Sequence, residues 1–166
     1  MAEIYFKTQE ISTCGSLPPI GTKAPDFYVT KTDLSTCALH DFKGQAVLIN
    51  TYPSIETLIC FDSVKTFQDL AIANPSLPIL CISMDLPFTL KRLEIGEHLN
   101  KVILLSDFRN REFGDLFGLT IKNGALAGLL ARSVILLDKD HRVVYDELVS
   151  DVSSHPHYEI PFDLLK

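Results

Sequence analysis

Residues 46–60 read Ala-Val-Leu-Ile-Asn-Thr-Tyr-Pro-Ser-Ile-Glu-Thr-Leu-Ile-Cys, and the pattern of this stretch changes at Pro53. Its first seven residues form a nearly continuous apolar run rich in β-branched side chains, which is typical of a strand buried on both faces. From Thr57 the apolar residues recur at helical spacing instead. The stretch therefore predicts a central strand over 46–52, a break at Pro53 and a helix that begins near Thr57.

Strands and helices alternate on either side of this stretch. The other expected elements are an N-terminal hairpin over 4–12, strands over 26–30, 77–83 and 101–106, a loop or single helical turn over 34–44, helices over 87–98, 110–117 and 158–165, and a hairpin of 132–138 with 141–148. This order predicts an α/β fold with a central mixed sheet flanked by helices, parallel at its centre and antiparallel where the last hairpin forms an edge. Because the 166 residues contain no linker or repeat, we expect one domain over 1–166.

The composition excludes several classes of function. The chain has 15 basic and 21 acidic residues and a net charge of −6, which argues against a nucleic-acid or anionic-membrane partner. It has no apolar run long enough to cross a membrane and no signal-peptide pattern, so we expect a cytoplasmic protein. It also lacks a Gly-rich phosphate loop, a GxSxG motif and paired carboxylates. We therefore expect neither a nucleotide-binding protein nor a hydrolase, and no cofactor.

The chain has four cysteines with no CxxC pair and no Cys/His cluster, so we expect free thiols and no metal site. Cys60 differs from the others because it lies where the central strand has ended and the next helix begins. The unpaired N–H groups of a first helical turn stabilise a thiolate. In open α/β sheets, ligands bind at the carboxyl ends of the strands, which is where Cys60 lies. Cys60 is therefore a candidate nucleophile. The alternative is a small buried residue at a helix start, and position alone does not decide between the two.

Pro53, Thr57 and Cys60 form a P-x-x-x-T-x-x-C pattern. A threonine three residues before a cysteine can bring its hydroxyl beside the sulfur, where it can donate to a thiolate and accept from a hydroperoxide. Pro53 would add an apolar wall to the same pocket, because proline has no backbone N–H to donate. The alternative for Thr57 is an N-cap, a position that threonine favours.

This pattern resembles the active-site signature of the peroxiredoxin family, and more narrowly of its bacterial thiol peroxidase branch, the atypical two-cysteine type. The branch carries P-S-[apolar]-[acidic]-T-x-x-C, and residues 53–60 match it throughout. Further segments of the chain are similar to the branch in the same order, at 80–88, 108–113 and 128–133. The resemblance implies a thioredoxin-like fold and thiol-dependent reduction of hydrogen peroxide and organic hydroperoxides.

The resemblance also implies roles for individual residues. Cys60 would be the nucleophile that becomes a sulfenic acid, Thr57 its hydroxyl partner, Pro53 a shielding wall and Arg132 the catalytic arginine. The position of Arg132 agrees, because it opens an apolar strand where a cation is costly without an anionic partner. An acidic residue, for example in the 138–147 hairpin, is the alternative partner.

The chain departs from this branch at Glu94. Members usually carry a resolving cysteine on the next helix, about 34 residues after the first, and that position here is Glu94. No cysteine lies between Pro87 and His98. The resemblance implies a homodimer, and we expect thioredoxin or a small-molecule thiol to reduce oxidised Cys60 directly.

Two alternatives concern the other cysteines and the function as a whole. Cys37, which the sequence places in an accessible loop, or Cys14 in a Gly/Pro-rich connector could take the resolving role. Cys81 lies in an apolar strand and is expected to be a core residue. A peroxide sensor or redox-relay protein, with a reactive Cys60 and no efficient turnover, is the alternative function.

Overall fold

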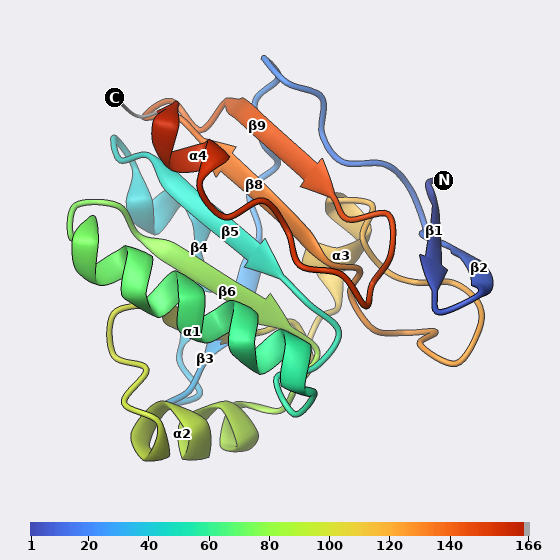
Figure 1. The fold of residues 1–166 in the computed structure, drawn as a ribbon. Coiled ribbons are helices and arrows are strands. Elements are labelled where there is room, and N and C mark those ends of the chain that lie inside the picture. Colours follow the sequence, from blue (N-terminus) through green and yellow to red (C-terminus); the bar gives the residue numbers. More distant parts are fainter. Residues whose placement is uncertain (165–166) are drawn as a thin grey trace.

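The computed structural model describes residues 1–164 and contains a mixed sheet of seven strands in the order β4-β3-β7-β6-β5-β8-β9 (Figure 1). The strands are β3 (Tyr28–Lys31), β4 (Thr36–Ala38), β5 (Val47–Thr51), β6 (Ile79–Ser83), β7 (Ile103–Ser106), β8 (Ser133–Leu137) and β9 (Val143–Leu148). A separate two-stranded hairpin consists of β1 (Glu3–Phe6) and β2 (Gln9–Ser12). The α/β fold with a mixed sheet and an N-terminal hairpin is therefore confirmed.

The helices are α1 (Leu58–Ala73), α2 (Pro87–Gly96), α3 (Glu112–Leu116), α4 (Ile160–Asp163) and the 3₁₀ helix η1 (Leu39–Phe42). The C-terminal helix was expected to extend to Leu165, and that residue lies outside the described part of the chain. None of the helices within residues 1–164 is long and apolar enough to cross a bilayer.

The strand directions differ in part from the sequence-based expectation. The centre of the sheet, β5-β6-β7, is parallel, and β8 and β9 are antiparallel, as expected. The opposite side is antiparallel as well, because β3 pairs antiparallel with both β7 and β4. The expectation of only a loop or helical turn over 34–44 is therefore wrong in part: residues 36–38 form β4, a strand too short to show an alternating pattern.

The sheet is buried on both faces, which explains the continuous apolar runs of its central strands. Along β5, Leu48 faces the core beneath α1 and α2, whereas Val47 and Ile49 face the core formed with α3 and the β1-β2 hairpin. Figure 1 shows α1 crossing one face of the sheet, with its first turn beside the ends of β5 and β6. The start of α1 thus lies at the carboxyl edge of two parallel strands.

Candidate active site

Cys60 lies in the first turn of α1, eight residues after Tyr52, which directly follows β5. Its side chain is 1% exposed and packs in the apolar core with Tyr52, Ile55 and Val64. This position combines the N-terminal turn of a helix with the carboxyl edge of a parallel sheet, as the sequence indicated. The thiol is therefore held in a closed, largely apolar site.

Arg132 is the polar partner of this thiol. Its Nη2 donates to Cys60 Sγ at 3.1 Å, and its Nε donates to the carbonyl of Val152 at 3.1 Å. The side chain is fully buried, and within residues 1–164 its Nη1 has no hydrogen-bond partner. Antiparallel pairing of Thr51 with Ser133 brings the residue before β8 to the end of β5, where Cys60 follows. The sheet register thus joins two residues that are 72 positions apart.

Thr57 and Pro53 frame the turn that leads into α1. Thr57 occupies the N-cap position with extended backbone angles, but its side chain makes no capping hydrogen bond. Its Oγ1 donates instead to the carbonyl of Ser54 at 3.1 Å, and the residue is exposed. No hydrogen bond joins Thr57 to Cys60 within the described residues, whereas Pro53 is buried beside the site.

Asp85 was not singled out from the sequence, and it binds the same turn. It follows β6 by two residues, and its carboxylate accepts hydrogen bonds from the Ser54 hydroxyl and from the Ile55 backbone N–H. The available signal was its place after the neighbouring parallel strand, at the sheet edge that also holds Cys60. Val152, the second partner of Arg132, gave no comparable signal because it contributes only a backbone carbonyl.

The other three cysteines are free thiols outside this contact. Cys81 is fully buried, and burial raises its pKa to about 12. Cys37, expected in an accessible loop, is 1% exposed on β4, and burial raises its pKa to about 11. The expectation of an exposed Cys37 is therefore wrong, because β4 turns this side chain into the core. Cys14 is half-buried, with its Sγ 3.6 Å from the carbonyl of Gly114.

Glu94, at the expected resolving position, ties α2 to the turn after β3. Its carboxylate accepts a hydrogen bond from the Thr32 hydroxyl at 3.1 Å and forms an ion pair with Lys91 at 2.8 Å. A second ion pair, between Arg92 and Glu56, joins α2 to the turn that precedes Cys60. Polar contacts therefore join α2 both to the turn after β3 and to the turn before Cys60.

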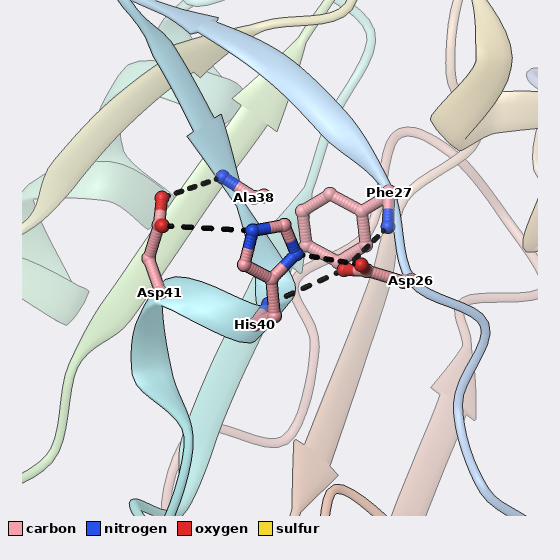
Figure 2. Close-up of polar contacts among 5 residues, drawn as sticks. All are labelled: Asp26, Phe27, Ala38, His40 and Asp41. Atoms are coloured by element: carbon pink, nitrogen blue, oxygen red, sulfur yellow. Dashed lines mark hydrogen bonds and ion pairs between the residues drawn. The ribbon is translucent and has the colours of Figure 1, made fainter.

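A second polar cluster lies around His40 (Figure 2). His40 Nδ1 is 2.7 Å from Asp26 Oδ2, and its Nε2 is 4.0 Å from Asp41. Burial alone would raise the pKa of Asp26, but the hydrogen bonds with His40 outweigh burial and lower it, and the same contact raises the pKa of His40. Asp26 and His40 border a cavity of about 370 Å³ located before the start of β5, whereas Cys60 follows the end of that strand. This cluster is therefore separate from the Cys60 site.

Comparisons with known sequences cover almost the whole chain. The Redoxin family model matches residues 19–159. The thiol peroxidase of Mycobacterium tuberculosis is 41% identical over 159 residues, which are 96% of this chain and 95% of that protein. The thiol peroxidase of Corynebacterium glutamicum is 37% identical over 159 residues, 96% of each chain.

Two solved structures are similar in fold to this chain over almost its whole length. The peroxiredoxin-like protein from Aquifex aeolicus superposes with a TM-score of 0.93 at 30% identity, over 99% of this chain and 96% of that chain. A thiol peroxidase from Chromobacterium violaceum gives a TM-score of 0.88 at 24% identity, over 98% and 94% of the two chains, and at this identity the likeness concerns the fold alone. The expected thioredoxin-like fold is thereby confirmed.

Proposed function

The chain belongs to the Redoxin family and is a peroxiredoxin of the thiol peroxidase type, and on this premise we propose that it reduces hydrogen peroxide and organic hydroperoxides through Cys60. The observation that carries the proposal is the 3.1 Å contact between the buried Arg132 guanidinium and Cys60 Sγ. A cation at this distance favours the thiolate, which is the nucleophilic form of cysteine. The first-turn N–H groups of α1 act in the same direction.

The proposed reaction transfers one oxygen atom to sulfur. The Cys60 thiolate attacks the terminal oxygen of the hydroperoxide, so that an S–O bond forms while the O–O bond breaks. Sulfur gives up two electrons, and the departing alkoxide or hydroxide takes a proton and leaves as an alcohol or water. Cys60 is then a sulfenic acid.

Three neighbouring residues fit roles in this step. Arg132 Nη1 has no partner within residues 1–164, so it can donate to the hydroperoxide and to the oxygen on which charge develops. Because the Thr57 hydroxyl hydrogen is directed at Ser54, its lone pairs are free to accept the hydroperoxide O–H. Pro53 supplies an apolar wall that competes for no hydrogen bond.

We further propose that an external thiol, either thioredoxin or a small molecule, regenerates Cys60. This thiol attacks the sulfenic sulfur and releases water, and a second thiol then reduces the mixed disulfide. Cys37 and Cys81 are poor resolving residues because both are buried and their raised pKa values keep them protonated at neutral pH. The homodimer and the cytoplasmic location stay predictions.

The test is stopped-flow peroxide consumption by variants that each lack one thiol. Cys60→Ser should abolish the reaction, whereas Cys14→Ser, Cys37→Ser and Cys81→Ser should keep the oxidation step. Repeated turnover with a small thiol supports a peroxidase, and oxidation that stops after one equivalent supports the sensor instead. Peroxide consumption at the wild-type rate by Cys60→Ser would show that Cys60 is not the nucleophile.

A further inference from the structure

We propose that Asp85 is a positioning residue for Cys60, because its carboxylate holds the turn from which α1 begins. This inference rests on the proposed role of Cys60 as the nucleophile. It concerns a residue that does not touch the sulfur and acts through Ser54 and Ile55.

The carboxylate of Asp85 accepts three hydrogen bonds from two segments. Its Oδ1 accepts the Ser54 hydroxyl at 2.6 Å, and its Oδ2 accepts the Ile55 N–H at 2.7 Å and the Ser83 hydroxyl at 2.7 Å. A backbone N–H is a fixed donor that cannot rotate away. The turn before α1 and the end of β6 are thus joined through one side chain.

The backbone of Asp85 is itself held by neighbouring strands. Its N–H donates to the Ser83 hydroxyl at 3.2 Å, and its carbonyl accepts the Ser106 hydroxyl at 2.5 Å. Both serines are fully buried and end β6 and β7. The carboxylate is therefore presented from the rigid edge of the sheet rather than from a free loop.

The contact continues from Ser54 to the start of the helix. The Ser54 carbonyl accepts both the N–H of Thr57 at 3.2 Å and its hydroxyl at 3.1 Å, and the Thr57 carbonyl accepts the N–H of Phe61 at 2.9 Å. Loss of the Asp85 contacts would leave Ser54 free to move. The Thr57 hydroxyl and the first helical turn would then no longer be held in one orientation. Cys60 belongs to that turn.

This role is geometric rather than electrostatic. A negatively charged carboxylate does not stabilise a thiolate, so we assign Asp85 an effect through the turn alone. An asparagine can reproduce the geometry: its oxygen can accept the Ile55 N–H and the Ser83 hydroxyl, and its NH₂ can donate to Ser54 Oγ. Asp85→Asn should therefore keep the turn in place, whereas Asp85→Ala leaves the Ile55 N–H unpaired.

The experiment compares Asp85→Ala, Asp85→Asn and wild type by two readouts, the rate of Cys60 oxidation by hydrogen peroxide and amide hydrogen exchange of residues 53–61. In Asp85→Ala the oxidation rate should fall about 10²-fold, as expected for a reactive group misplaced by about 1 Å, and exchange should accelerate. Asp85→Asn should restore most of the rate and of the protection. Ser54→Ala removes the Oδ1 contact, together with the hydrogen bond from the Glu56 N–H to Ser54 Oγ at 3.3 Å. It keeps the Ile55 contact, so it should fall between them and serves if Asp85→Ala does not fold.

Asp107→Ala is the matched control. The Asp107 carboxylate likewise accepts two backbone N–H groups, those of Phe113 and Gly114, but it holds α3 rather than the turn of Cys60. This variant should lose thermal stability and keep the oxidation rate. Unchanged exchange over 53–61 in Asp85→Ala, or an Asp85→Asn variant as slow as Asp85→Ala, would overturn the inference. If Asp85→Ala shows faster exchange over 53–61 but Cys60 of the wild type does not react with peroxide, the positioning role of Asp85 is supported and the proposed function alone is refuted.

Discussion

Arg132 carries a structural cost that its contact with Cys60 explains. A fully buried guanidinium loses its hydration, and here one of its nitrogens has no partner among the described residues. Replacement of a buried charged group by an apolar side chain of similar volume is often neutral or stabilising. We therefore infer that Arg132 serves the proposed reaction rather than stability, and mutation can separate the two effects.

We predict that Arg132→Met slows Cys60 oxidation by about 10²-fold or more, because a donor to the developing charge is lost. The free energy of unfolding should stay unchanged or rise by about 1 kcal/mol, because a buried guanidinium with an unpartnered Nη1 is gone. Stopped-flow oxidation and urea denaturation measure the two quantities. Arg142→Met is the control, since Arg142 is an exposed arginine that donates to one carbonyl, that of Gly21. A wild-type oxidation rate in Arg132→Met would remove Arg132 from the site.

At the level of residues, the sequence identifies what is local and misses what is distant. Pro53, Thr57 and Cys60 lie within eight residues, so a pattern can reveal them. The contact of Arg132 with Cys60 was expected through the family resemblance, and its place at the start of an apolar strand indicated only that it needs a partner, because the contact depends on the pairing of β5 with β8. Asp85 was missed for the same reason, because its hydrogen bonds join the segment after β6 to the turn after β5.

Among the elements, α3 depends on a carboxylate outside itself. It has only five residues, too few for a stable isolated helix, and its N-cap residue Arg111 makes no side-chain cap. Asp107 supplies the missing acceptor for the N–H groups of Phe113 and Gly114. Burial raises the pKa of Asp107 to about 6, so ionisation of this carboxylate opposes folding.

We predict that Asp107 makes the protein less stable as pH rises from about 4 to about 6. A folded-state pKa above the unfolded value of 3.8 means that the folded state binds more protons in this window, so the contribution is complete below it and lost above it. The loss should be about 1–2 kcal/mol after allowance for solvent screening. The free energy of unfolding of wild type minus that of Asp107→Asn, measured across this range, should fall as pH rises. A difference that is constant or grows would contradict the assignment.

The long elements follow from sequence periodicity, whereas the short ones follow from tertiary contacts. The apolar runs predicted β5, β6 and β8 to within about two residues. Strand β4 has three residues and exists because Val29 on β3 pairs with Cys37. A segment of that length shows no period, and this is why Cys37 was misplaced in an accessible loop.

Across the whole molecule, the thiols are distributed so that none stands ready to resolve Cys60. Cys81 lies mid-strand in the core and Cys37 is buried on β4, both with raised pKa values. Cys14 contacts Gly114 of α3, a helix that packs on the face of the sheet opposite to α1. The position on α2 at which the family resemblance implies a resolving cysteine holds Glu94 instead, which is bound to Thr32.

We therefore predict that one equivalent of peroxide leaves Cys60 as a sulfenic acid that dimedone traps, and that excess peroxide drives it to the sulfinic acid because no thiol intercepts it. Glu94→Cys places a thiol at the position on α2 where the family resemblance implies a resolving cysteine, so this variant should form an internal disulfide with Cys60 and resist overoxidation. Glu94→Ser is the control, since it also breaks the contacts with Thr32 and Lys91 but adds no thiol, and it should overoxidise like the wild type. Non-reducing peptide mapping and intact-mass spectrometry distinguish these products. A stoichiometric disulfide from Cys60 to Cys14, Cys37 or Cys81 in the wild-type protein would show that the resolving role has moved to another part of the chain.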